Sequence, residues 1–209
     1  DRNEYNLYKR KCDATGKDVI SIYRADAPFP VYNQEYWKSD KFDATEYGRG
    51  FDFNRPFFEQ YEELRRVVPH LAMVYSNSVN CEYTNQCNNN KECYMLFTSN
   101  QSEKCLYGNW HQYSYFMSDC SMANKSEFCY ECVNITNCYR AFYSVDCENS
   151  ADIYFCRDCN SCTDCFGCVN LRNKSYHIFN QPMGNKETYQ AKLKELDDNL
   201  DDVEDDVQD

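Results

Sequence analysis

Residues 156–168 read CRDCNSCTDCFGC, so a cysteine stands at every third position from Cys156 to Cys168. The same frame holds outside this stretch, because all 15 cysteines of the chain have residue numbers divisible by three. For independent positions this agreement has a probability of roughly three to the minus fourteenth, which indicates an internal repeat. Such repeats are typical of solenoids, in which each coil packs on the next.

A longer, 18-residue period also recurs within this frame. It relates the cysteines of two sets, Cys129, Cys147 and Cys165, and Cys120, Cys138 and Cys156. Rows of this length starting at Tyr75 align apolar residues as in a strand that keeps one face inward. The sequence therefore predicts a mainly β fold, a β-solenoid of about six 18-residue coils over residues 75–182, with cysteines along its inner wall.

The sequence leaves the handedness of this solenoid open. Hexapeptide β-helices also have coils of three hexapeptides, but their inward residues are unequally spaced, so the handedness is undetermined. Pentapeptide-repeat coils are longer and fit less well. The alternative without a repeat is a globular all-β domain with irregular strands.

Residues 1–74 lack the repeat and predict a small α+β cap. Strand-like runs at 5–11 and 18–23 flank a turn-rich segment, which is typical of a hairpin. Asn54 is the expected N-cap of a helix over residues 55–68, with Pro56 in its first turn and an apolar stripe along one face. We expect this helix to cover the open first coil and to shield its edge hydrogen bonds.

The C-terminal segment, residues 185–209, predicts an acidic amphipathic helix or tail. Apolar residues recur there at heptad spacing: Tyr189, Leu193, Leu196, Leu200, Val203 and Val207. The remaining positions are rich in aspartate, which disfavours pairing of this helix with a copy of itself. Capping of the solenoid and coiled-coil pairing are both open, and we expect the last residues to fray.

The composition excludes two classes of partner. A net charge of −12 does not suit nucleic-acid binding, which needs clustered Lys and Arg. No run approaches the roughly 18 consecutive apolar residues of a membrane span. The chain opens at Asp1 without Met or a signal-like segment, so we expect the true N-terminus to be missing. Reduced cysteines favour the cytoplasm, whereas disulfides would indicate an extracellular protein.

The cysteines are also the candidate ligands of a metal, either zinc or an iron–sulfur cluster. Residues 156–168 match iron–sulfur spacing and overlap the C-x2-C pairs of zinc sites. In a solenoid, however, consecutive cysteines lie on successive parts of the perimeter, so residues of one 18-residue column are the better ligand sets. The candidates are Cys93, His111, Cys129, Cys147 and Cys165, then Cys120, Cys138 and Cys156, and finally Cys159 with His177. Buried reduced thiols and disulfide ladders are the alternatives.

The remaining candidate residues do not indicate an enzyme. His70 is expected at the surface or in a cap, and Cys12 is expected to belong to a metal segment further upstream. The chain has no Gly-x-Ser-x-Gly, no phosphate-binding glycine loop and no His-Glu-x-x-His. His111 could serve as the base of a hexapeptide-helix acyltransferase, but the coils lack the aliphatic and small residues of that class.

Four longer stretches resemble a known family: residues 7–17 (LYKRKCDATGK), 47–53 (YGRGFDF), 55–60 (RPFFEQ) and 165–174 (CFGCVNLRNK). They are similar to an uncharacterised family of cysteine-rich proteins from ultra-small candidate-phylum bacteria, and the resemblance spans essentially the whole chain. It implies a zinc-ribbon-like segment upstream of Asp1, which this chain lacks. It implies no particular activity and no catalytic residues.

These observations favour a non-enzymatic structural or protein-interaction scaffold that presents a tyrosine- and asparagine-rich surface to a protein partner or to its own copies. The alternative is a zinc or iron–sulfur protein that uses the Cys and His columns. A third hypothesis, an acidic mimic of DNA, is disfavoured because the charge is concentrated in the tail.

Overall fold

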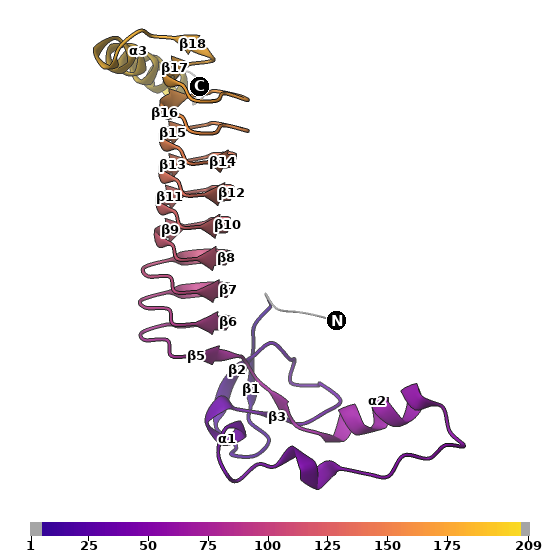
Figure 1. Cartoon of the computed structure of the whole chain (residues 1–209). Coiled ribbons are helices and arrows are strands. Elements are labelled where there is room, and N and C mark those ends of the chain that lie inside the picture. The colour runs from indigo at the N-terminus through magenta and orange to yellow at the C-terminus, as the bar shows by residue number, and fades with distance from the viewer. Residues whose placement is uncertain (1–5, 206–209) are drawn as a thin grey trace.

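The computed structural model describes residues 6–205, and the side chains of residues 6–197. It is a β-solenoid rod with a small α+β region at its N-terminal end and a helix at its C-terminal end (Figure 1). The β-solenoid predicted from the cysteine frame is therefore confirmed.

The coil, however, is shorter than the sequence predicted. β12 (Val133–Thr136) pairs in parallel with β14 (Val145–Glu148), and Val133 lies beside Val145. The other parallel pairs of the solenoid have the same 12-residue offset. The solenoid thus makes about nine turns, each a 12-residue coil, and the expected six 18-residue coils were wrong. An 18-residue step is one and a half coils, which preserves the frame of three.

The central coils each contribute two short strands. Coil positions are numbered here from 1 at Val133 to 12 at Ser144, and the strands occupy positions 1–4 and 7–10. The first set contains β6 (Asn85–Asn88), β10 (Ser121–Asn124), β12 and β14. The second contains β9 (Tyr115–Ser118), β11 (Glu127–Tyr130), β13 (Tyr139–Phe142), β15 (Ala151–Tyr154), β16 (Thr163–Phe166) and β17 (Ser175–Ile178). β7 (Tyr94–Asn100) and β8 (Leu106–Gln112) continue through a corner, and β5 (Tyr75–Ser76) begins the first coil.

A backbone bend at every third residue gives the coil its four corners. From Asn77 to Phe179 each third residue has a φ between 45° and 60°. Few residues adopt this left-handed region without cost, and Asn and Asp do so more readily than most. Some asparagines, such as Asn134 and Asn137, occupy these bends, and so do aromatic residues such as Tyr143 and Phe155. The residue after each bend points inward, at positions 3, 6, 9 and 12.

Small side chains fill the interior. Thirteen of the 14 solenoid cysteines are buried there, together with Met117, Ile135 and Ile153. Serines occupy many of the other inward places, and these are Ser99, Ser102, Ser114, Ser126, Ser144 and Ser150. A 12-residue coil leaves little space between its walls, so larger residues are few.

Cysteine and serine recur inside because their γ atoms connect successive coils. The Ser126 hydroxyl accepts the backbone N–H of Cys138 at 3.2 Å and donates to the carbonyl of Asn124 at 3.0 Å. The Cys147 thiol likewise donates to the Val145 carbonyl, while its sulfur accepts the backbone N–H of Cys159. A buried N–H without a partner would cost about 1–3 kcal/mol. The inward γ groups remove that cost.

Side chains cover both open ends of the solenoid. At the first coil, Gln34 of α1 (Gln34–Trp37) accepts the N–H of Tyr75 at 3.1 Å, and Lys38 donates to the Tyr75 carbonyl at 3.4 Å. At the last coil, the Asn180 amide accepts the N–H of Val169 and donates to its carbonyl, each at 2.9 Å. Free strand edges invite pairing with other chains, and these contacts block it.

The N-terminal region is built on two small sheets. β1 (Tyr8–Lys11) pairs antiparallel with β2 (Asp18–Ser21), which forms the hairpin that the turn-rich segment predicts. β3 (Val31–Tyr32) pairs in parallel with β4 (His70–Leu71), and the short helix η1 (Ala44–Tyr47) lies between α1 and α2.

Helix α2 (Phe57–Val67) differs from the prediction in its start and its role. It begins after Pro56, and Asn54 is not its cap, because the Asn54 side chain and N–H both bind Asp52. The helix lies away from the solenoid axis (Figure 1), so α1 and Lys38, and not α2, cover the first coil. Every side chain of α2 is exposed or only half-buried.

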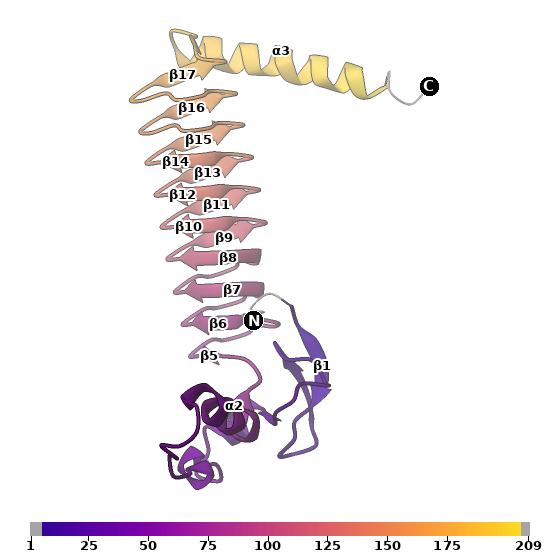
Figure 2. The ribbon, with the colours of Figure 1, turned by 90° about the vertical axis from the view of Figure 1, so that its right-hand side faces the viewer.

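The C-terminal helix α3 (Lys186–Asp205) follows the hairpin of β17 and β18 (Gln181–Pro182). Asn185 accepts the N–H of Thr188 at 2.8 Å and so caps the helix start. Tyr189 is buried beside Tyr176 at the last coil, and from there α3 projects sideways from the rod (Figure 2). Val207, the last residue of the heptad pattern, lies outside the described residues.

The inward position 12 of one coil is a glycine, Gly108, and the imidazole of His111 occupies the space that a side chain would fill there. His111 is fully buried at position 3, and its Nε2 donates to the carbonyl of Cys120 at 2.9 Å. A Cβ on Gly108 would lie 2.5 Å from the imidazole and 2.7 Å from that carbonyl oxygen. Gly108 is therefore the residue that admits a ring into this narrow core.

We expect Gly108→Ala to lower the free energy of unfolding by about 1–3 kcal/mol, because the added methyl overpacks the core against a ring and a backbone oxygen. Urea denaturation measures the change. Gly50→Ala is the control, since a Cβ there meets nothing within 4 Å. Equal stability of Gly108→Ala and the unchanged protein would show that the core relaxes freely around position 12.

Candidate functional site

The candidate metal ligands that are 18 residues apart do not stack above one another in the solenoid. Because an 18-residue step is one and a half coils, Cys129 and Cys165 lie on one wall and Cys147 lies on the opposite wall. Cys120 and Cys156 likewise face Cys138 across the core. The 18-residue sets proposed from the sequence are therefore not stacked, and the true neighbours are separated by one 12-residue coil.

His111 and His177 also have other neighbours than expected. His111 does not lie between Cys93 and Cys129, since its position in the adjacent coil is occupied by Ala123. His177 pairs with Cys165 and not with Cys159, and its Nδ1 contacts the Ser175 carbonyl at 2.8 Å. Each histidine thus has a backbone hydrogen-bond partner.

A chain of contacting thiols lies near the C-terminal end of the solenoid. The Cys147 thiol interacts with that of Cys159 in the next coil, Cys159 also interacts with Cys156 across a corner, and Cys156 interacts with Cys168. Cys165 continues the chain through Cys168. Cysteines three residues apart, such as Cys156 and Cys159, therefore contact each other across a corner. The sequence predicted that they lie apart, because the expected 18-residue coil would be wider.

Burial and the contacts between these thiols shift their pKa values in opposite directions. The interaction with the neighbouring Cys159 thiol, and then burial, raise the pKa of Cys147. The neighbouring thiols of Cys147 and Cys156 hold the pKa of Cys159 below its ordinary value. The pKa of Cys168 is lowered in the same way, by Cys156 and then Cys165. Cys159 and Cys168 are thus the members of this group of five thiols whose pKa is lowered.

The described residues nevertheless contain no group of three or more Cys, His, Asp or Glu side chains placed to hold a metal ion. All cysteines are free thiols, and Cys81 alone is half-buried rather than buried. Cysteine here serves first as a small interior residue whose sulfur bonds to the backbone.

Cys12 and His70 belong to the N-terminal region. Cys12 is buried, and burial raises the pKa of its thiol, but hydrogen bonds from Thr15 and from the N–H of Asn33 outweigh this and lower it. His70 is half-buried, with its ring 4.0 Å from that of Phe29 and its Nε2 against the Arg65 carbonyl. His70 therefore helps to hold α2 on the sheet of β3 and β4.

Many of the aromatic residues on the outer surface of the solenoid gather along one edge, although others, such as the stacked pair Phe116 and Phe128, lie at position 8. The aromatic edge, at positions 10 and 11, contains Tyr83, Tyr94, Tyr107, Tyr130, Phe142, Tyr143, Tyr154, Phe155, Phe166 and Phe179. Tyr143 stacks on Phe155 with ring centres 4.9 Å apart, and Phe155 is 52% exposed. The edge is interrupted at Ser118 and Asp119.

The opposite edge is mainly polar, with Tyr113 as an exposed exception. The asparagine edge, at positions 4 and 5, contains Asn88, Asn89, Asn100, Asn124, Asn137, Asn149, Asn160 and Asn173. Neighbouring coils bond along it, as where Asn137 donates to the side-chain oxygen of Asn149 at 2.8 Å. The tyrosine- and asparagine-rich surface expected from the sequence is thus divided between two edges half a coil apart.

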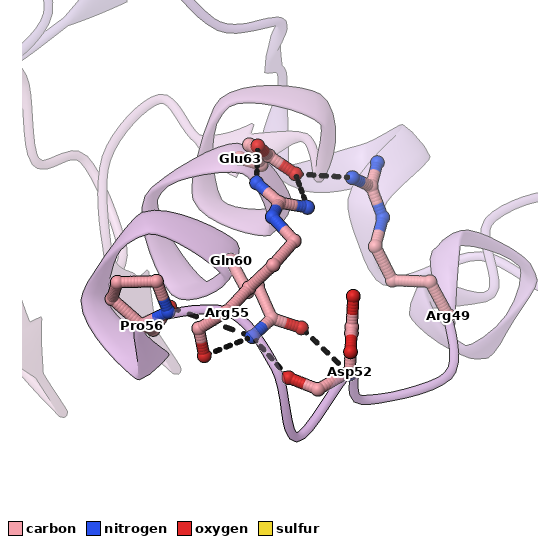
Figure 3. A network of polar contacts seen from close by, with 6 residues as sticks. All are labelled: Arg49, Asp52, Arg55, Pro56, Gln60 and Glu63. Carbon is pink, nitrogen blue, oxygen red and sulfur yellow. Dashed lines mark hydrogen bonds and ion pairs between the residues drawn. The ribbon is translucent and has the colours of Figure 1, made fainter.

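A polar network fastens the segment before α2 to the helix (Figure 3). Gln60 accepts the N–H of Asp52 at 2.8 Å and donates to the carbonyls of Asp52 and Arg55. Glu63 binds Arg55 and, at 3.6 Å, Arg49, and the hydrogen bond from Arg55 lowers the pKa of this carboxyl. The segment therefore keeps a defined position against α2 although it is exposed.

This network borders an open cavity that has aromatic rings around it. The cavity, about 260 Å³, lies between Arg49, Arg55, Phe51, Phe57 and Tyr61. Five exposed rings form what we call the aromatic cluster, and they are Phe51, Phe53, Phe57, Phe58 and Tyr61. Phe58 is 80% exposed and Phe53 is 90% exposed. An exposed apolar patch of this size is typical of an interaction site.

Comparisons with known proteins add no assignment. The chain matches no protein family model and no curated protein. In the described part of the chain, none of the helices has the length and apolar character that a bilayer crossing requires.

The sequence predicted which residue types are exposed on α2 and on the solenoid, but it did not predict where those residues lie on each surface. The aromatic stripe of α2 was visible, yet its amphipathic pattern could not show that the face stays uncovered. The two edges of the solenoid were hidden by the incorrect coil length. A 12-residue period is visible when serine is counted with cysteine, as in Ser102, Ser114 and Ser126.

Burial lowers the pKa of His111, so the folded protein binds a proton at this ring less readily than the unfolded chain, whose histidines titrate near about 6.5. The stabilisation by the neutral ring is complete above that pH. It is lost as pH falls, at up to about 1.4 kcal/mol per pH unit. We expect His111→Gln to flatten the dependence of unfolding free energy on pH between about 7 and 5.

Urea denaturation at several pH values measures this slope. Met117→Leu is the matched control, because it alters the same core without a titratable group, and it should retain the slope of the unchanged protein. An unaltered slope in His111→Gln would show that this ring is not the group responsible.

Proposed function

We propose that the chain is a non-enzymatic scaffold, a cysteine-lined rod that binds a protein partner along its aromatic edge and associates with its own copies. The observation that carries this proposal is the uneven outer surface, with a row of exposed rings along the aromatic edge and mainly asparagines along the opposite edge. Aromatic residues are enriched in the buried cores of protein interfaces. Stacked coils also hold these rings rigidly, so that little side-chain entropy is lost on binding.

The shape of the rod supports a structural role. Each coil adds about 4.8 Å of length and contacts only its neighbours. The side-chain caps at Tyr75 and Val169 disfavour growth by stacking coil on coil. Self-association therefore involves other surfaces than the solenoid ends.

A photo-crosslinking amino acid at position 155 or at position 149 tests the partner site. Phe155 and Asn149 are half a coil apart and are both exposed bends with positive φ, so the two replacements are matched. In cells that express the protein naturally, we expect a defined protein adduct from position 155 and none from position 149. Equal adducts from both, or none from either, would contradict binding along the aromatic edge.

A second candidate function is metal binding, and the observation that favours it is the chain of thiols through Cys147, Cys159, Cys156 and Cys168. Thiolates are the ligands that zinc, copper(I) and iron–sulfur clusters prefer. Because three thiols are not yet placed around one point in the described residues, binding would draw neighbouring walls together.

Elemental analysis of anaerobically purified protein, with thiols counted before and after denaturation, tests this candidate. For a metalloprotein we expect at least about one metal atom per chain, lost in Cys159→Ser and kept in Cys87→Ser, which removes a buried cysteine outside the thiol chain. Metal-free protein with nearly all thiols titratable after denaturation would rule it out.

A further inference from the structure

Two apolar surfaces that no other part of the described residues covers lie at opposite ends of the rod. One is the aromatic cluster on α2. The other is the apolar face of α3, where Leu193 and Leu196 are only half-buried after Tyr189 has packed on the last coil. Figure 2 shows α3 projecting away from the solenoid, so this face is available to another molecule. In sequence the same heptad pattern continues through Leu200 and Val203.

Charge decides which surface suits α3. Residues 186–209 contain three lysines and ten Asp or Glu residues, a net charge of −7, so two such helices would repel each other. Residues 49–68 contain four arginines and four acidic residues and are neutral. The aromatic cluster therefore offers apolar area without repulsion, whereas a second α3 does not.

The α2 site also has the form that an amphipathic helix requires. Helices bind grooves through apolar residues spaced three or four apart, as Leu193 and Leu196 are. The cavity between Phe51 and Phe57 can receive one such side chain. Arg49 contacts Glu63 through a single ion pair of 3.6 Å, so its guanidinium can bind a carboxylate of an incoming acidic helix.

We propose that α3 of one copy docks on the aromatic cluster of α2 in a second copy, so that rods join head to tail. This inference rests on the self-association in the proposed function and names the surfaces that produce it. Because the two surfaces differ and lie at opposite ends of the rod, each joined copy leaves one of each free. Such heterologous contacts extend into linear assemblies unless their geometry closes a ring.

Two blocked variants test the proposal by complementation. Phe57→Asp with Phe58→Asp blocks the α2 surface, and Leu193→Asp with Leu196→Asp blocks that of α3. Sedimentation velocity should show concentration-dependent oligomers for the unchanged protein and monomers for each variant alone. An equimolar mixture of the variants should form dimers and nothing larger, because it contains only one intact pair of surfaces.

Gln190→Asp with Lys194→Asp is the matched control, since both residues are exposed and off the apolar seam of α3. It should retain the oligomers of the unchanged protein, and circular dichroism should show that every variant is folded. Monomers of the unchanged protein at all concentrations would overturn both the self-association and the head-to-tail contact. Oligomers of either blocked variant alone, or a purely monomeric mixture, would overturn the head-to-tail contact and leave self-association intact.

Discussion

The hydrogen bond from an inward backbone N–H to the γ atom of the residue one coil earlier is the interaction on which this solenoid depends. The bend before each inward residue turns its N–H toward the core, where water is excluded. A serine oxygen or a cysteine sulfur one coil below accepts it, as Ser126 does for Cys138 and Cys147 for Cys159. The same γ group donates to a carbonyl two residues earlier, so both its polar functions are satisfied.

This requirement explains the unusual composition of the chain. The interior needs small residues with a γ donor and acceptor, and cysteine and serine are those that also fit a 12-residue coil. The bends have positive φ, which asparagine and aspartate tolerate best, and aromatic residues such as Tyr143 and Phe155 occupy other bends on the outer surface. Aromatic residues then remain for the outside, where rings on successive coils stack at about the spacing of the strands, as Phe142 and Tyr154 do at 4.9 Å.

The sequence revealed the solenoid because the inward frame of three is independent of coil length. It did not reveal the length of the coil, because cysteine alone marks the inward positions incompletely and serine, alanine and isoleucine hold the rest. The candidate metal ligands were wrongly grouped for the same reason. Local signals were more reliable: the hairpin of β1 and β2 follows from its turn residues, whereas the uncovered position of α2 depends on tertiary contacts that a helical pattern does not contain.

Because every coil has 12 residues, the length of the rod can change without changing how the residues of its outer surface line up from coil to coil. Insertion or loss of one whole coil lengthens or shortens the rod by one step of about 4.8 Å and leaves every outer residue above its former neighbour. A change of half a coil would place the asparagine edge above the aromatic edge and divide both surfaces. Gene segments encoding whole coils are therefore the unit in which such a protein can change its span while its binding edge stays continuous.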